Sequence, residues 1–309
     1  MRKLIVIAAT VLAAACGRPT PLELARTTTF ELAREHGRHV EIDGLQVFAI
    51  TLGTGRDVLL LHGNPASTYS WRKVIEPLAE HFRVHAIDLP GYGFSDKPSD
   101  ATYEVGWHAR FVAGYLDAAD IERAVLVGNS MGGHVASEVA ILFRSRVSAL
   151  VLIGASGLQS GPPADRELPM AFRIANWPVV GPLVRALPSR PIVANGLRDA
   201  VFDASTITEA DVDAYYAPLR TKNGLVAFLR RTSLPIDEDR GDIVALIGAP
   251  TLVITGDSDR LVPPAIARRY HELIDGSRLV VLERTGHLPQ EERPERVVQE
   301  IVEFLGAGG

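Results

Sequence analysis

Short apolar runs alternate with longer helical patterns along most of the chain. The runs predict buried strands, and they lie at residues 58–61, 83–87, 124–127, 149–153, 251–254 and 279–282. Apolar residues recur at helical spacing between these runs, over residues 71–80, 104–119, 132–143 and 264–274. Strands that are apolar throughout and alternate with helices are typical of a parallel sheet with helices on both faces. We therefore predict an α/β fold built on a mostly parallel central sheet.

One stretch, residues 157–234, departs from this alternation. It is rich in proline and has helical patterns near residues 209–216 and 224–232. We expect it to form an inserted helical lid over the carboxyl ends of the strands, where ligands bind in open α/β sheets. The α/β core then comprises residues 39–156 and 235–309.

The start of the chain has a different pattern. Two basic residues precede an apolar run over residues 4–15, and small residues then lead to the only cysteine, Cys16. This order is typical of a secretory signal, and the run is too short to span a bilayer. We expect a signal segment over residues 1–16 and a tether over residues 17–38.

The overall composition narrows the class of protein. Hydrophobic residues make up 47% of the chain and charged residues 22%, which is an ordinary globular balance. The formal net charge of −5 gives no electrostatic reason to expect a nucleic acid partner. With one cysteine in the chain, an intramolecular disulfide is excluded in spite of the predicted export.

A candidate nucleophile lies where a predicted strand meets a predicted helix. The run Gly-Asn-Ser-Met-Gly-Gly at residues 128–133 contains Gly-x-Ser-x-Gly, the pattern of a nucleophile elbow, with Ser130 at its centre. Such a turn strains the backbone of the serine and leaves no room for side chains at the two glycines. The serine also lies at a helix N-terminus, where developing negative charge is stabilised.

Partners for this serine follow in the expected chain order of acid and then histidine. Asp257 and Asp259 come just after one predicted strand, and His287 comes just after the next. The carboxyl ends of parallel strands share one edge of the sheet, so these side chains should lie near Ser130. The histidine would accept the serine proton, and the acid would fix its tautomer and stabilise the imidazolium. Spacing alone leaves both aspartates open as the acid.

The chain resembles the α/β-hydrolase superfamily over roughly residues 39–305. The matching motifs are His-Gly-Asn-Pro at 62–65, Asp-Leu-Pro-Gly-Tyr-Gly-Phe-Ser-Asp at 88–96, the elbow at 128–133, Asp-Arg-Leu-Val-Pro at 259–263 and Gly-His at 286–287. The resemblance implies that the acid is Asp259, because it precedes the Val-Pro pattern. It also implies an oxyanion hole formed by the backbone N–H groups of Asn64 and Met131. His62 and Asp88 are expected to brace loops.

The loop at residues 62–72 is also similar to that of haloalkane dehalogenases. Dehalogenases and epoxide hydrolases of this fold attack with an aspartate, whereas this chain has Ser130 at the same position. A serine alkoxide suits acyl carbonyls, so both aspartate-based chemistries are disfavoured. Tyr215 and Tyr216 are similar to the tyrosines that open epoxides, and we interpret them as lid packing.

Two serine chemistries remain. The elbow is similar to that of hydrolases that cleave carbon–carbon bonds in ring-fission products, but those usually carry an aromatic residue where Leu288 follows His287. The lid is similar to that of bacterial lipase-like esterases. We therefore expect a carboxylic ester hydrolase that forms an acyl-enzyme on Ser130, takes a small and apolar ester, and needs no metal or organic cofactor. A non-catalytic ligand-binding protein of the same fold is the alternative from another class.

Cys16 follows small residues in a pattern similar to the lipobox of bacterial lipoproteins. The resemblance implies that its thiol is acylated and that it becomes the new N-terminus. Leucine is commoner at the position of Ala13, three residues before the cysteine. We expect a lipid-anchored protein of the bacterial cell envelope, with a soluble periplasmic or secreted protein as the alternative.

Overall fold

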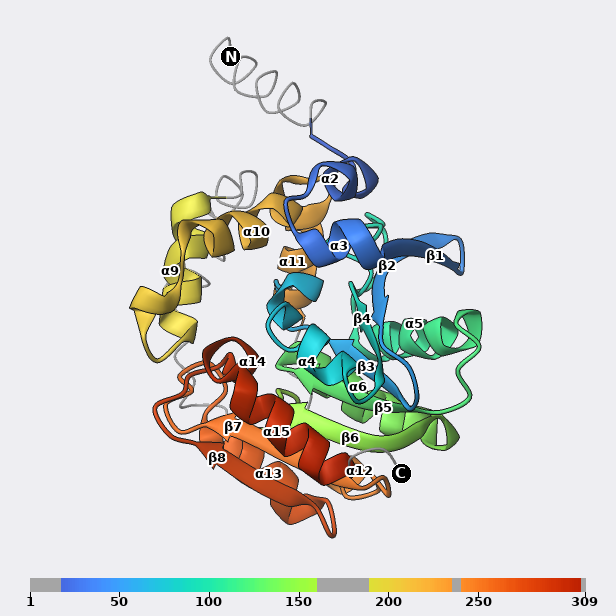
Figure 1. Cartoon of the computed structure of the whole chain (residues 1–309), viewed down its shortest axis with the longest axis vertical. Coiled ribbons are helices and arrows are strands. Elements are labelled where there is room, and N and C mark those ends of the chain that lie inside the picture. Colours follow the sequence, from blue (N-terminus) through green and yellow to red (C-terminus); the bar gives the residue numbers. More distant parts are fainter. Residues whose placement is uncertain (1–17, 160–188, 235–239, 307–309) are drawn as a thin grey trace.

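A single eight-stranded sheet forms the centre of the molecule (Figure 1). The computed structural model describes residues 18–159, 189–234 and 240–306. Its strands are β1 (Gly37–Ile42), β2 (Leu45–Leu52), β3 (Asp57–Leu61), β4 (Arg83–Ile87), β5 (Ala124–Asn129), β6 (Val147–Ile153), β7 (Thr251–Gly256) and β8 (Arg278–Leu282). Their order across the sheet is β1-β2-β4-β3-β5-β6-β7-β8.

The strands from β4 to β8 are parallel, as the apolar runs predicted. Only β1 and β2 run against their neighbours, and they form a hairpin in which Val40 lies opposite Val47. The hairpin turn places Asp43 at φ 50° and Gly44 at φ 77°, a left-handed pair that suits the twist of the two strands. The fold is therefore the predicted α/β-hydrolase arrangement, with β5 and its following serine near the middle of the sheet.

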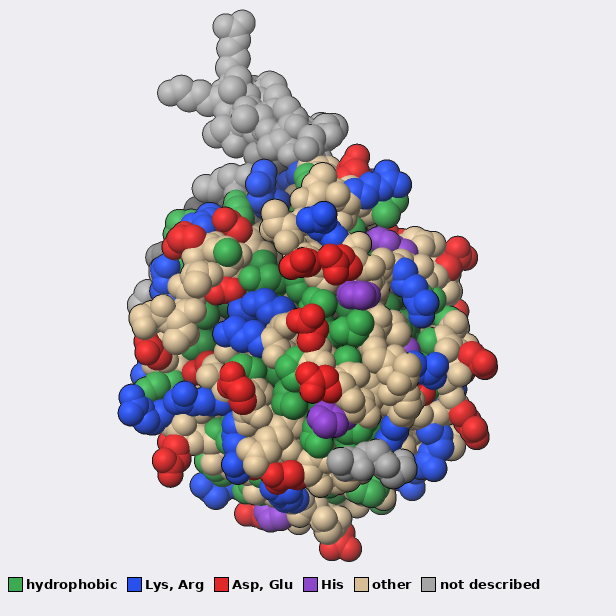
Figure 2. All heavy atoms as spheres, viewed as in Figure 1, with side chains coloured by type: hydrophobic (Ala, Val, Ile, Leu, Met, Phe, Trp, Pro, Cys, Tyr) green, Lys and Arg blue, Asp and Glu red, His purple; other side chains and the backbone are tan. Residues whose placement is uncertain are grey.

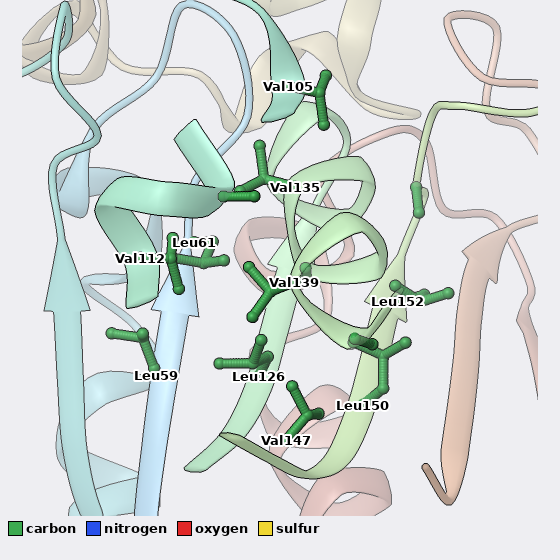
Figure 3. Close-up of a cluster of buried hydrophobic side chains, with 14 of the residues drawn as sticks. Leu59, Leu61, Val105, Val112, Leu126, Val135, Val139, Val147, Leu150 and Leu152 are labelled. Carbon is green, nitrogen blue, oxygen red and sulfur yellow. The ribbon is translucent and has the colours of Figure 1, made fainter. Parts of the chain in front are cut away.

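Helices cover both faces of the sheet. Helices α5 (Val105–Ala118), α6 (Met131–Leu142), α12 (Gly241–Val244) and α13 (Pro264–Leu273) pack on one face. Helices α3 (Glu31–His36), α4 (Ile75–Ala79) and α15 (Pro294–Leu305) pack on the other. Figure 3 shows the first interface, where side chains of α5 and α6 meet those of β3, β5 and β6. Full burial of each such Val or Leu is worth about 1.5–3 kcal/mol, which holds the elbow between β5 and α6 in place.

One predicted helix, over residues 71–80, is broken in two. The 3₁₀ turn η1 (Thr68–Trp71) precedes α4, and the side chain of Ser67 caps it by accepting from the N–H of Tyr69. The N–H of Val74 then donates to the carbonyl of Trp71, three residues back, so no continuous α-helix connects the two pieces.

The segment that we expect to form the lid is helical in the part that the structure describes, and we call residues 189–234 the lid segment. It contains α9 (Arg190–Ala200), the short turn η4 (Ala204–Thr206), α10 (Glu209–Arg220) and α11 (Gly224–Ser233). Our expectation covered residues 157–234, and residues 160–188 of that range lie outside the described residues. Helix α10 begins with a capping box between Thr208 and Asp211, which explains where the predicted helical pattern starts.

Residues 17–38 were expected to be a tether, but from Arg18 onward they fold against the molecule. They form α2 (Pro21–Thr27), α3 and the start of β1. A capping box between Thr20 and Glu23 starts α2, and two apolar residues of α3 are buried beside β2. The signal segment lies outside the described residues. Within the described ranges, no helix is both long and apolar enough to cross a bilayer.

Candidate active site

Ser130 occupies a strained turn between β5 and α6. Its backbone lies at φ 54° and ψ −117°, a region that few non-glycine residues adopt. The turn needs glycine on both sides: a Cβ on Gly128 would collide with the carbonyl of Gly132, and one on Gly132 would collide with the carbonyl of Leu61. Ser130 is therefore presented at the carboxyl edge of the sheet, at the N-terminus of a buried helix.

His287 and Asp259 face each other across the ends of β8 and β7. The distance from His287 Nδ1 to Asp259 Oδ2 is 2.7 Å, and both residues are buried. The other carboxylate oxygen of Asp259 accepts hydrogen bonds from the N–H groups of Leu261 and Val262, at 2.9 and 2.8 Å. This loop fixes the carboxylate, so Nδ1 of His287 is the protonated nitrogen, and Nε2 has no hydrogen-bond partner among the described residues.

Asp257, the other candidate acid, lies elsewhere. Its exposed side chain accepts from the hydroxyl of Ser258 at 2.8 Å and from the N–H of Thr285. The hydrogen bond from Ser258 lowers the pKa of the Asp257 carboxyl. The structure therefore pairs the histidine with Asp259 and leaves Asp257 as a cap on the following loop.

Backbone contacts bring the serine and histidine segments together. The side-chain amide of Asn129 donates to the carbonyls of Ile153 and His287, at 3.1 and 3.2 Å. Gly154, the next residue after β6, lies against the pair, because a Cβ there would be 3.2 Å from the Asp259 carboxylate and 3.4 Å from His287 Nδ1. A glycine at this strand end makes room for an acid that comes from the later loop.

The two predicted oxyanion donors flank the serine. A Cβ on Gly63 would lie 3.1 Å from Cβ of Ser130, so the loop that carries Asn64 runs beside the nucleophile. Met131 is the first residue of α6. Within the described part of the chain, no acceptor takes a hydrogen bond from the N–H of Asn64 or Met131. Both groups are free to donate to a negatively charged oxygen formed at the carbonyl of a substrate.

His62 and Asp88 brace the loops on the other side of the serine. The Nδ1–H of buried His62 donates to its neighbour's carbonyl, Gly63 O, at 2.7 Å, and its Nε2 accepts from the N–H of Leu89 at 3.0 Å. Burial lowers the pKa of His62 and keeps the ring neutral. The Asp88 carboxylate accepts from the N–H groups of Thr68 and Phe94, at 2.6 and 2.7 Å.

Sequence reasoning missed Glu292, which holds the histidine loop. Its carboxylate accepts from the N–H of Gly286 at 2.9 Å and more weakly from that of Leu288, so it bonds on both sides of His287. It also accepts from the N–H of Phe202, just after α9, at 2.7 Å. Two neighbouring glutamates in α14 (Pro289–Glu292), directly after the histidine, were the available signal.

A second missed feature is a buried ion-pair network between the lid and the core. Arg72 lies 2.7 Å from both Asp211 of α10 and Glu291 of α14. The hydroxyl of Tyr215 donates to Glu291, and burial raises the pKa of both groups. Tyr215 therefore ties α10 to α14.

Known proteins resemble this chain across its length. The model of the alpha/beta hydrolase family matches residues 58–300. A 2-hydroxy-6-oxo-2,4-heptadienoate hydrolase of Pseudomonas putida is 32% identical, over 88% of this chain and 97% of the relative. A meta-cleavage product hydrolase from Pseudomonas fluorescens IP01 has a TM-score of 0.75 at 28% identity, over 88% of this chain and 98% of that one.

A solved membrane phospholipase A, described as a bacterial virulence factor, is also 28% identical with a TM-score of 0.75. This alignment covers 99% of this chain and 98% of the phospholipase. The sheet order, the strained serine and the matched family model agree. The chain is a hydrolase and belongs to the α/β-hydrolase family.

Proposed function

We propose that the protein is a serine hydrolase that cleaves carboxylic esters through an acyl-enzyme on Ser130. The observation that carries this proposal is the arrangement of three side chains at neighbouring strand ends. Ser130 lies on a strained turn after β5, and the 2.7 Å contact between His287 and Asp259 leaves one imidazole nitrogen to accept a proton.

In the proposed first step, Ser130 Oγ attacks the ester carbonyl as His287 Nε2 takes its proton. The N–H groups of Asn64 and Met131 stabilise the oxyanion, while the Asp259 carboxylate stabilises the imidazolium. The alcohol leaves with the proton returned by His287, and the acyl group stays on the serine. A water molecule, deprotonated by the same histidine, then attacks the acyl-enzyme and releases the acid. This sequence needs neither a metal nor an organic cofactor.

The surroundings of the histidine favour esters with an apolar group. Leu288 is buried in a cluster that includes Ala66 of the oxyanion loop and Leu197 of α9. An apolar wall between the lid and the histidine suits an acyl chain or aryl group. The similarity to a membrane phospholipase A over 99% of the chain supports the same class of substrate. We further propose, from the sequence around Cys16, a lipid anchor at the cell envelope.

The second candidate is hydrolysis of a carbon–carbon bond in a ring-fission diketone. The names of the Pseudomonas relatives favour it, and so does the elbow sequence at residues 128–133. Against it, Leu288 replaces the usual aromatic residue after the histidine. In addition, the side-chain amide of Asn129 in the elbow already donates to two backbone carbonyls, so its N–H groups are not free to bind a diketone.

A direct comparison of substrates tests this proposal. We expect the purified protein to hydrolyse nitrophenyl esters, with a preference along a chain-length series, at a higher kcat/KM than a ring-fission diketone. A fluorophosphonate probe should label the wild-type protein and leave Ser130→Ala unlabelled. A diketone that reacts faster than every ester would replace our proposal with the second candidate. Labelling and turnover that persist in Ser130→Ala would refute both.

A further inference from the structure

The N-terminal arm, residues 18–27, is docked on the lid. The carbonyl of Pro19 accepts a hydrogen bond from the N–H of Lys222, at 3.1 Å, in the turn between α10 and α11. Helix α2 follows directly, contacts α10, and begins at buried Pro21 (Figure 1). The described chain therefore begins beside the lid, away from the amino ends of the strands.

The lid turn that receives this arm is itself fixed to the core. The Thr221 hydroxyl donates to the carbonyl of Pro218 at 2.6 Å, and the side-chain amide of Asn223 donates to the carbonyl of Lys97 at 2.9 Å. On the next helix, Ala227 is fully buried, and a Cβ on Gly91 would lie 3.1 Å from its side chain. The N-terminal arm, the turn between α10 and α11 and the core loop thus form a continuous set of contacts. The start of the arm at Arg18 therefore keeps a fixed place beside this turn.

The distance from Cys16 to this docked arm is short. Only Gly17 separates Cys16 from Arg18, and two residues span at most about 7 Å. If Cys16 carries the lipid anchor that we propose, Arg18 cannot leave the surface of the membrane. The lid turn at Lys222 must then lie close to the same surface.

The side chains at this end of the molecule suit a lipid surface. Leu22 of α2 and Val226 of α11 are exposed, at 46% and 41%. Among residues 18–27 and 220–226, the exposed charged side chains are Arg26, Arg220, Lys222 and Glu23. Lys and Arg side chains are visible beside the start of the described chain in Figure 2. A basic side chain close to an anionic bilayer favours binding, and exposed apolar side chains add to it.

We propose that the docked arm holds the turn between α10 and α11 against the bilayer, so that the enzyme takes its ester substrate from the membrane itself. The substrate class is an ester lipid, such as a glycerophospholipid. This inference rests on the proposed ester hydrolysis for its substrate and on lipidation of Cys16 for its geometry. A long free tether would let the enzyme rotate, whereas the docked arm gives it one orientation.

Fluorescence quenching by lipids tests the orientation without any catalysis. Once the Cys16 thiol is acylated, an introduced cysteine is the only free thiol, so Lys222→Cys and Ser145→Cys can each be labelled with a fluorophore on the lipidated protein. Lys222 is exposed on the lid turn, and Ser145 is exposed at the amino end of β6. In vesicles containing headgroup-brominated phospholipid, we expect strong quenching at residue 222 and none at residue 145. Equal quenching, the reverse order, or none at either position would overturn the proposal.

A spacer variant tests the substrate source. About 20 Gly and Ser residues inserted between Gly17 and Arg18 add a flexible link of about 25 Å. We expect this variant to lose about fivefold of its activity on a phospholipid embedded in vesicles, because the lid is no longer held at the surface. Its kcat/KM on a soluble short-chain nitrophenyl ester should be unchanged.

The two substrates also separate this inference from the proposed function. Equal activity of the spacer variant and the wild type on embedded lipid overturns the inference that the docked arm lets the enzyme take its substrate from the membrane, and it leaves ester hydrolysis standing. Failure of both proteins on the soluble ester refutes the proposed function instead. The quenching result is independent of either outcome, and Ser130→Ala, in which the lid contacts are intact, should show the same quenching pattern.

Discussion

Two Asp–His sets lie on opposite sides of Ser130, and only one of them is arranged for catalysis. His62 and Asp88 follow β3 and β4, whereas Asp259 and His287 follow β7 and β8. Both sets are buried at the same edge of the sheet. In the first set, every hydrogen bond that the two side chains make among the described residues is with the backbone: His62 with Gly63 and Leu89, and Asp88 with backbone N–H groups.

In the second set, the carboxylate of Asp259 bonds directly to the imidazole of His287. One nitrogen is thereby oriented while the other has no hydrogen-bond partner among the described residues. The difference teaches that residue type and strand-end position do not make a catalytic pair by themselves. A histidine whose two nitrogens are both occupied braces a loop, and a histidine with one anchored and one open nitrogen can move a proton.

Disrupting the second set, Asp259 and His287, should have the largest effect, and this effect should be on the rate and not on stability. We expect Asp259→Asn to lower kcat by about 10⁴-fold, because the amide no longer holds the proton on Nδ1 or stabilises the imidazolium. Asp257→Asn, two residues away on the same loop, is the matched control and should leave kcat nearly unchanged. Steady-state kinetics on a soluble nitrophenyl ester measures both. A larger loss in Asp257→Asn would reassign the acid.

Disrupting the first set, His62 and Asp88, should instead lower the stability of the folded protein. Asp88→Ala leaves the buried N–H groups of Thr68 and Phe94 without acceptors, and each such loss costs about 1–3 kcal/mol. We therefore expect the free energy of unfolding to fall by about 3–5 kcal/mol, measured by urea denaturation. Asp100→Ala, at an exposed position on a nearby loop, should change it little. If Asp88→Ala lowers kcat by orders of magnitude at unchanged stability, Asp88 belongs to the catalytic set.

A lower pH should destabilise the folded protein through the buried, neutral histidines on the side of His62 and Asp88. Beside His62, burial lowers the pKa of His108 to about 4, while the unfolded chain titrates near 6.5. The unfolded state therefore binds more protons between these values, and stability falls as pH decreases through this window. For His108 alone the loss between pH 7 and pH 5 is about 2 kcal/mol. Urea denaturation at both pH values should show a smaller difference in His108→Gln, with exposed His271→Gln as the control. An unchanged difference in His108→Gln would mean that folding does not lower the pKa of this histidine.

Local chemistry explains what could be predicted from the sequence. The run over residues 149–153 falls within β6 because a strand buried on both faces of a sheet is apolar along that part of its length. Ser130 and His287 were found because each comes shortly after such a run, whereas Asp259 was chosen over Asp257 by the family resemblance. Asn64 and Met131 were placed by the family resemblance, and the structure brings both beside the serine.

The missed features depend on contacts between distant parts of the chain. Arg72 and Asp211 are both charged residues in polar surroundings along the sequence, and only the folded lid buries them together. Helix α9 was not predicted because its apolar positions are interrupted by Pro191, Asn195 and Gly196, and its burial comes from α10 and the histidine loop beside it. Propensity and periodicity do not record such tertiary partners.

Glu292 shares a feature with each set. Like Asp88 it accepts hydrogen bonds from backbone N–H groups, but those groups belong to the loop of the catalytic His287. We expect Glu292→Gln to lower kcat by about tenfold, equivalent to about 1.4 kcal/mol, because the neutral amide loses one acceptor oxygen and its N–H₂ faces the donors at Gly286 and Phe202. KM for a soluble ester should change little, since Glu292 is not placed to touch the substrate. Glu295→Gln, exposed on α15, is the control. A loss confined to KM would place Glu292 in substrate binding, and full activity would show that the contact of Asn129 with the His287 carbonyl suffices to position the loop.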